Sequence, residues 1–163
     1  KNSIVDILNS RDKIVGTGFL ANENLIVTCA HVVMVAGAID GDMVQVRFHE
    51  RTEKLNALVV PEYWRDVDKG DVAVLRLENV PDVIRPLPLG NAAGSGGYDF
   101  YAYGYAIVTE VQGISAHGKI VDIVENDGLV QLALQEPDHG MSGGPVLDES
   151  CQIIKGNFDQ AGI

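Results

Sequence analysis

The sequence predicts an all-β fold in which two small antiparallel barrels pack together. Short apolar runs rich in Val, Ile and Leu recur along the chain, and Gly, Pro, Asn and Asp separate them. The 18 glycines and 6 prolines are typical of a turn-rich β protein. No segment sustains a helical apolar period over about twelve residues, so the pattern disfavours a helical fold.

The first barrel is predicted over residues 1–79, from six runs that suit half-buried strands. These runs are residues 3–9, 13–21, 25–29, 43–48, 54–60 and 72–77. A short helix is expected over residues 30–35, directly after the third run. The second barrel is predicted over residues 98–163, from runs at 98–107, 118–124, 129–134, 145–147 and 152–157.

A linker is predicted between the two sets of strands, over residues 80–97. It contains a run of prolines and a glycine cluster, which are turn and loop signals: Pro81, Pro86, Pro88, Gly94, Gly96 and Gly97. A phosphate-binding loop over residues 91–97 is the alternative. The segment lacks the Gly-Lys-Ser/Thr ending and no helical pattern follows, so this alternative is disfavoured.

The amino-acid composition excludes a disordered chain and disfavours several kinds of partner. The chain has 163 residues and a formal net charge of −11, with 46% apolar residues. The apolar content is enough to bury a core, which excludes a disordered chain. The acid excess argues against nucleic acid and against anionic membrane surfaces as partners. No apolar run reaches the roughly 18 residues that a spanning helix needs.

The two cysteines, Cys29 and Cys151, exclude a disulfide-dense scaffold. One bridge between them is possible, but two free thiols are the simpler interpretation, and Cys29 is expected to be buried packing rather than a redox switch. The chain begins at Lys1 rather than Met, which we take as a sign of a fragment or a processed form. A cytoplasmic location is expected, although a removed leader would leave no trace.

His31 is the first candidate for chemistry, in Thr28-Cys29-Ala30-His31. A histidine just after a buried strand and before a short turn is held in a fixed orientation at a barrel rim. The alternative is an ordinary core or surface histidine.

Asp71 is the second candidate, because it opens the apolar run at 72–77. An acid there is costly to bury unless a group such as an imidazole N–H pairs with it. The alternative is a turn aspartate that ends a loop. Asp66 and Asp68 are nearby competitors, but neither leads directly into a strand.

Ser142 is the third candidate and has the most specific context, Gly140-Met141-Ser142-Gly143-Gly144-Pro145. A nucleophilic serine needs a tight turn that exposes its hydroxyl and backbone N–H groups aimed at the developing oxyanion. Glycines permit such backbone conformations. A generic glycine turn is the alternative.

The order His, Asp, Ser, with each residue at a strand end, resembles the chymotrypsin-like (trypsin-like) serine protease superfamily. Gly16-Thr17-Gly18-Phe19-Leu20 and Leu87-Pro88-Leu89-Gly90 also fit this resemblance. It spans nearly the whole chain and is strongest to compact bacterial trypsin-like peptidase domains, some of which are fused to signalling or defence modules. The resemblance implies two six-stranded-type barrels, and the second is expected to be incomplete at its C-terminus.

The resemblance also implies roles. His31 matches the general base, Asp71 the acid that orients it, and Ser142 the nucleophile that forms an acyl-enzyme. The backbone N–H groups of Gly140 and Ser142 match the oxyanion hole. The expected partners are a protein or peptide substrate and a regulatory domain or partner protein; no cofactor and no metal are expected, because no His/Cys/Asp cluster has zinc-site spacing.

Departures from the digestive members of the superfamily bear on regulation. Met141 stands where those enzymes have an Asp that pairs with a newly cut N-terminus, so that switch cannot operate in this chain. Val32 stands where they have a bridged cysteine. A missing bridge fits a reducing compartment.

The resemblance also gives three candidate residues for the substrate pocket. By ungapped counting, Glu136 matches the position where the superfamily has the base of its primary specificity pocket, and the resemblance then implies a preference for Lys or Arg before the scissile bond. A solvated loop acid is the alternative. Asp159 falls near the pocket wall, and His139 adjoins the oxyanion loop. His49 and His117 are expected to be solvated, and Trp64 to be a packing residue.

The sequence therefore predicts a serine endopeptidase. The main alternative is a catalytically silent, protease-like binding module with the same fold. A small-ester hydrolase of another fold is disfavoured, because Pro145 follows two glycines and leads into a strand rather than a helix.

Overall fold

The computed structural model describes residues 2–91, 94–104, 114–124, 129–134, 142–148 and 153–155. Its first half is a closed antiparallel barrel in the strand order β1-β2-β3-β6-β5-β4. The strands are β1 (Ile4–Leu8), β2 (Ile14–Leu20), β3 (Leu25–Thr28), β4 (Met43–Phe48), β5 (Leu55–Val59) and β6 (Ala73–Leu77). β1 pairs with both β2 and β4, which closes the sheet and leaves no free edge.

The barrel interior is filled by side chains from every strand. In β4 the residues alternate: Val44, Val46 and Phe48 are buried, whereas Met43 and Gln45 are exposed. This period of two is what a half-buried strand requires. The buried set is largely Val, Ile, Leu and Phe, as the sequence pattern predicts.

The carboxylate of Asp6 is also buried in this barrel. The Asp6 side chain is 3% exposed and accepts two hydrogen bonds from the Arg47 guanidinium, at 3.0 and 2.6 Å. Its other oxygen, Oδ1, has no hydrogen-bond partner among the described residues. Burial raises the pKa of the Asp6 carboxyl above its usual range, although Arg47 opposes the shift.

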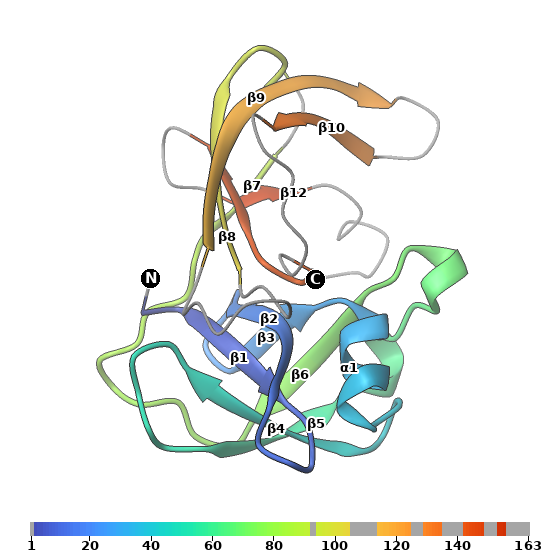
Figure 1. Ribbon diagram of the computed structural model, residues 1–163, viewed down its shortest axis with the longest axis vertical. Helices are drawn as coiled ribbons and strands as arrows, with labels where there is room; N and C mark the ends of the chain where they lie inside the picture. Colours follow the sequence, from blue (N-terminus) through green and yellow to red (C-terminus); the bar gives the residue numbers. More distant parts are fainter. Residues whose placement is uncertain are drawn as a thin grey trace.

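Helical structure in the described part of the chain is short. Helix α1 (Ala30–Ala36) follows β3 and packs at one end of the barrel (Figure 1), with Gly37 as its left-handed C-cap at φ 93°. Two 3-10 turns, η1 (Pro61–Tyr63) and η2 (Val67–Lys69), lie between β5 and β6. No helix of the described residues is long and apolar enough to cross a membrane.

The second half forms a partial barrel-like sheet above the first barrel (Figure 1), in the order β10-β9-β8-β11-β12-β7. Its strands are β7 (Leu89–Asn91), β8 (Asp99–Gly104), β9 (Ile114–Val124), β10 (Leu129–Leu134), β11 (Val146–Asp148) and β12 (Ile153–Lys155). Phe100 and Ile120 are fully buried and form the centre of its core. The all-β, two-sheet prediction is confirmed.

Two details of the sheet differ from the sequence prediction. β7 lies inside the expected linker and pairs in parallel with β12, so that linker residues complete the second sheet. β9 begins at Ile114, four residues earlier than expected. A three-residue strand containing a glycine has too little alternation to be recognised from sequence.

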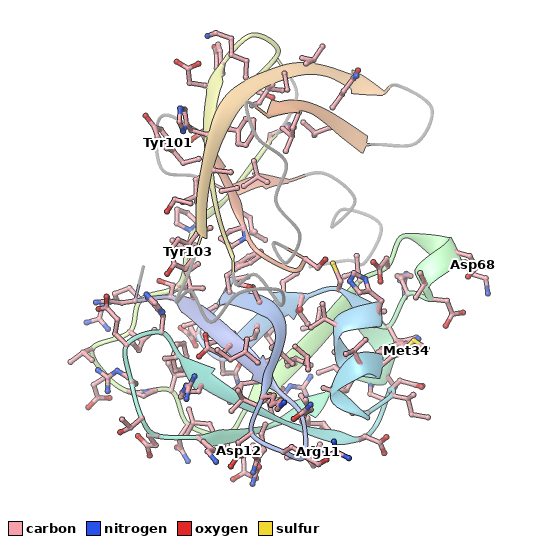
Figure 2. The ribbon with its side chains drawn as sticks, in the orientation of Figure 1. Arg11, Asp12, Met34, Asp68, Tyr101 and Tyr103 are labelled. Atoms are coloured by element: carbon pink, nitrogen blue, oxygen red, sulfur yellow. The ribbon has the colours of Figure 1, made fainter. Side chains whose placement is uncertain are left out.

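The two sheets meet across a buried apolar cluster. Ile4, Phe19 and Val74 of the barrel pack there with Tyr103 of β8, and Leu147 of β11 adds to it. The Tyr103 hydroxyl is also hydrogen-bonded to His49 Nε2 at 2.9 Å. Figure 2 shows Tyr103 at this junction, whereas Tyr101 lies farther along the outer face of the second sheet.

The expectation that His49 is solvated was wrong. Its side chain is 12% exposed, and its ring lies against the ring of Tyr103 from the second sheet. Its contact to Tyr103 joins residues 54 positions apart, which no local pattern reveals. His117 is exposed, as expected.

Candidate active site

The first part of the site is the connection from β3 to α1, which holds His31. α1 begins at Ala30, and its N-cap, Cys29, makes no side-chain capping bond. The first N–H groups of a helix have no partner within the helix. In this helix the His31 N–H donates to Asp71 Oδ1 at 2.9 Å, so an aspartate from another element takes the place of a local cap.

The His31 ring contacts the same carboxylate. His31 Nδ1 lies 2.5 Å from Asp71 Oδ2. An ionised carboxylate only accepts hydrogen bonds, so Nδ1 carries the proton and Nε2 is left as the basic nitrogen of the neutral ring. Asp71 therefore holds His31 at two places, the backbone N–H and the ring Nδ1.

Strand register explains why these two residues meet. β3 and β6 are paired, with Thr28 opposite Ala73. His31 follows Thr28 by three positions and Asp71 precedes Ala73 by two, so both leave the sheet at the same rim.

The Asp71 backbone is held in an unusual conformation. Its φ of 54° is in the left-handed region, directly after Gly70 at φ 114°. Aspartate tolerates this region better than most residues. The Asp71 N–H donates to the Asp66 carbonyl at 3.0 Å, which fixes the turn. Of the competing acids, Asp66 instead accepts from Trp64 and Lys69, and Asp68 lies at the outer tip of the loop (Figure 2).

Ser142 lies just before β11 and contacts the first barrel through its backbone. Its carbonyl accepts a hydrogen bond of 3.1 Å from the Thr17 N–H of β2. The next residue, Gly143, has φ 80°, and a Cβ there would collide with the Thr17 carbonyl and the Thr28 hydroxyl. The glycine is therefore required both by conformation and by close approach.

These segments surround one cavity of about 250 Å³. Its lining combines the end of β3, the turn before β6 and the glycines after Ser142: Thr28, Cys29, Gly70, Asp71, Val72, Gly143 and Gly144. The structure thus brings the three predicted segments together at one junction between the sheets. Gly140, Glu136, His139 and Asp159 lie outside the described residues, as does Met141.

Cys29 is the residue of this site whose position the sequence did not reveal. Its potential ligand atom lies within 4.8 Å of those of His31 and Asp71. Burial and the nearby Asp71 charge raise the pKa of the Cys29 thiol to about 12.

These three side chains also form a candidate metal-ligand set. However, the His31 Nδ1 and Asp71 Oδ2 atoms are already bonded to each other. A thiol that holds its proton so firmly is a poor source of the thiolate that a metal prefers. The arrangement suits acid–base chemistry better than metal binding.

The architecture, a closed barrel beside a second barrel-like sheet, is that of the two-barrel peptidases. The chain belongs to the trypsin-like peptidase domain family, whose sequence profile matches residues 16–154. It is therefore a peptidase domain of the serine protease type, and proteins or peptides are the substrate class.

Solved structures agree with this fold. The chain is similar to the Rv3671c protease of M. tuberculosis H37Rv in an inactive form, and to a serine-to-alanine mutant of that protein, also in an inactive form. In each case the identity is 23%, the TM-score is 0.68, and the match covers 93% of this chain and 75% of the other. A search of curated protein sequences gives no significant match.

Proposed function

We propose that this domain is a serine endopeptidase that cleaves peptide bonds through Ser142, His31 and Asp71, with an acyl-enzyme intermediate. The observation that carries the proposal is the double contact of Asp71 with the His31 backbone and ring, at 2.9 and 2.5 Å. It fixes the ring orientation and leaves Nε2 as the base.

The proposed cycle uses each group in turn. His31 Nε2 takes the proton of the Ser142 hydroxyl as its oxygen attacks the scissile carbonyl carbon. The backbone N–H groups of Gly140 and Ser142 stabilise the oxyanion. His31 then gives the proton to the leaving amine, and a water molecule, activated in the same way, hydrolyses the acyl-enzyme. Asp71 remains ionised and stabilises the imidazolium.

The turn at Gly143 supports this assignment for Ser142. The Ser142 carbonyl accepts a hydrogen bond from the Thr17 N–H of β2, and Gly143 lies close against the Thr17 carbonyl and the hydroxyl of Thr28, the last residue of β3. A nucleophile located by backbone contacts to the opposite barrel keeps its register with the base, which effective catalysis requires.

Further features belong to the same proposal. We divide the chain into a His31–Asp71 barrel over residues 1–79, a linker over 80–97 and a Ser142 barrel over 98–163. We also propose regulation by an attached domain or partner, and a cytoplasmic setting.

Glu136 is the proposed base of the substrate pocket. A cleavage profile measured with a peptide library tests this role, and a profile indifferent to Lys and Arg contradicts it.

The test is labelling by a fluorophosphonate probe. Wild type is expected to be labelled, and Ser142→Ala is expected to lose the label. Ser115→Ala, which removes an exposed hydroxyl on β9, is the matched control and keeps it. Equal labelling of wild type and Ser142→Ala rejects the assignment. A wild type that is not labelled, alone or with its adjoining domain, favours the silent binding module.

A further inference from the structure

The loop that ends in Asp71 is closed at its base by two backbone hydrogen bonds. The Arg65 N–H donates to the Val72 carbonyl at 2.9 Å, and the Val72 N–H donates to the Arg65 carbonyl at 3.2 Å. Residues 66–71 lie between this pair, and Asp71 is the last of them. The position of the carboxylate that binds His31 therefore depends on what holds this loop in shape.

The end of the loop has an unfavourable backbone conformation. Gly70 has φ 114° and Asp71 has φ 54°, both in the left-handed region. For a residue with a side chain, such a conformation persists only where neighbouring contacts hold it. The Asp71 backbone therefore needs a partner of its own, in addition to the contacts that its carboxylate makes with His31.

Asp66 supplies this backbone partner. Its carbonyl accepts hydrogen bonds from the Lys69 N–H at 2.8 Å and the Asp71 N–H at 3.0 Å. Its carboxylate does not cap the 3-10 turn η2 that follows it. Instead, Oδ1 accepts from Trp64 Nε1 at 2.9 Å and Oδ2 accepts from Lys69 Nζ at 3.2 Å. One residue therefore contacts the start, the outer part and the Asp71 end of the loop.

The two carboxylate contacts of Asp66 differ in how their donors are held. The Trp64 side chain packs against the core of the first barrel, so its indole N–H is a fixed donor. The Lys69 side chain is 68% exposed, and an exposed ion pair of this kind adds little stability. The bond to Trp64 is therefore the one that fastens the loop to the barrel.

We propose that Asp66 is a positioning residue for the His31–Asp71 pair: its carboxylate fastens the loop to Trp64, and its carbonyl holds the Asp71 N–H. The inference rests on the proposed function and adds two residues to it, Asp66 and Trp64, which act through Asp71 rather than on a reacting atom. Catalysis is sensitive to displacements of about 1 Å, so a loosened loop is expected to slow the reaction.

The experiment compares Asp66→Ala with Asp66→Asn. The asparagine side chain keeps an oxygen that accepts from Trp64 Nε1, whereas alanine has none. Asp66→Ala is expected to lower kcat about tenfold, because Asp71 is held less precisely. KM is expected to change less than about twofold, because Asp66 is not among the described residues that line the cavity of the site. Asp66→Asn is expected to keep kcat within about threefold of wild type.

Trp64→Phe tests the connection from Asp66 to the barrel. Phenylalanine keeps a ring against the core but has no N–H, so this variant is expected to lower kcat as Asp66→Ala does. The two substitutions break the same hydrogen bond, so the double variant is expected to be within about twofold of the slower single variant. Effects that multiply in the double variant show that the two residues act independently, and they overturn the proposal.

Two variants of exposed residues are matched controls. Asp68→Ala removes a carboxylate from the same loop, and Lys69→Gln removes the exposed partner of Asp66. Both are expected to keep kcat within about twofold of wild type. Thermal unfolding is measured for every variant, and kcat is measured at a temperature at which all of them are folded. Unchanged kcat in Asp66→Ala overturns the proposal, as does an Asp66→Asn variant that is as slow as Asp66→Ala.

A second readout does not depend on activity. In a Ser142→Ala background, amide hydrogen exchange reports the bond from the His31 N–H to Asp71 Oδ1. Asp66→Ala is expected to speed exchange of this N–H about tenfold, while the amides of β4 keep their protection and Asp66→Asn preserves the slow rate. This result supports the positioning role even if the wild type is not labelled by the fluorophosphonate probe, in which case the proposed function alone fails. Equal exchange of the His31 N–H with Asp66 and with Asp66→Ala rejects the positioning role.

Discussion

The two sheets hold the proposed catalytic residues in different ways. The first is a closed barrel, in which every strand has two neighbours, and His31 and Asp71 leave it at adjacent strand ends. The second sheet runs from β10 to β7 without closing, and Ser142 stands before its three-residue strand β11. The Ser142 carbonyl is hydrogen-bonded to Thr17, and Gly143 lies close to Thr28, both in the first barrel.

This difference indicates that the first barrel is the platform for the whole site. It fixes the His31–Asp71 pair through strand pairing, and it also provides the surface on which the turn of Ser142, the proposed nucleophile, rests. The second sheet supplies the serine. Substitutions in the first barrel and in the second sheet are therefore expected to affect the proposed catalysis in different ways.

The largest effect is expected for Asp71→Asn. Asparagine tolerates the left-handed backbone, so the fold is kept. Its amide presents an N–H toward His31 Nδ1 and favours the wrong ring tautomer, so kcat is expected to fall about 10⁴-fold. Hydrolysis assays and thermal unfolding are measured together. Asp68→Asn, at the exposed loop tip, is the control (Figure 2). An Asp71→Asn enzyme within about tenfold of wild type contradicts the role of Asp71.

The next largest effect is expected on local stability, when Phe48→Ala in the core of the first barrel is compared with Phe100→Ala in the core of the second sheet. Both remove a fully buried ring, so each is expected to cost about 3–5 kcal/mol of local stability. Because the first barrel is closed on itself, Phe100→Ala is expected to speed amide hydrogen exchange in β8 and β9 while β1–β6 keep their protection. Equal acceleration in both sheets indicates that the two fold as one unit.

A smaller effect is expected for Tyr103→Phe, which removes the hydroxyl bonded to His49 across the junction. The loss of one such hydrogen bond is expected to lower the free energy of unfolding by about 1 kcal/mol. Tyr101→Phe is the matched control, because it lies on the same strand and is exposed. Equal stabilities of the two variants in chemical denaturation show that the bond adds nothing to the junction.

The smallest expected effect is a change of stability with pH that comes from Asp6, which is buried in the first barrel. Its folded pKa is raised above the ordinary 3.8, because burial outweighs the opposing contribution of Arg47. The folded state then holds the proton more firmly than the unfolded state. The stabilising contribution of this group is complete below pH 3.8 and is lost as the pH rises through the folded pKa.

The matching measurement is the unfolding free energy of wild type and Asp6→Asn across mildly acidic pH. The wild type is expected to lose stability relative to Asp6→Asn as the pH rises above about 4. A relative gain over the same interval shows that Arg47 dominates and that the pKa is lowered instead.

Much of the fold was predictable because it depends on local patterns. The alternating apolar residues of β4 and the glycine and proline punctuation indicate strands and turns directly. β7 was missed, since its pairing with β12 joins residues more than sixty positions apart and leaves no local period. His49 was misjudged for a similar reason, because its contact with Tyr103 joins residues far apart in the chain.

The candidate site shows the same contrast between features set by local sequence and contacts between distant residues. His31, Asp71 and Ser142 are predicted as site residues from residue type, strand ends and order along the chain. The Asp71 contact to the His31 N–H could not be read from sequence, because it depends on the register of β3 with β6. The position of Cys29 depends on the same register and on the approach of Gly143.

The sequence by itself determined the two-sheet, all-β architecture, the peptidase family and the residue types of the site, because periodicity and short motifs are local properties. Only the tertiary structure decided how the carboxylate of Asp71 is shared between backbone and ring, which residues line the cavity beside it, and which groups join the two sheets. Those contacts bridge elements far apart in the chain, and strand pairing and packing alone fix their distances.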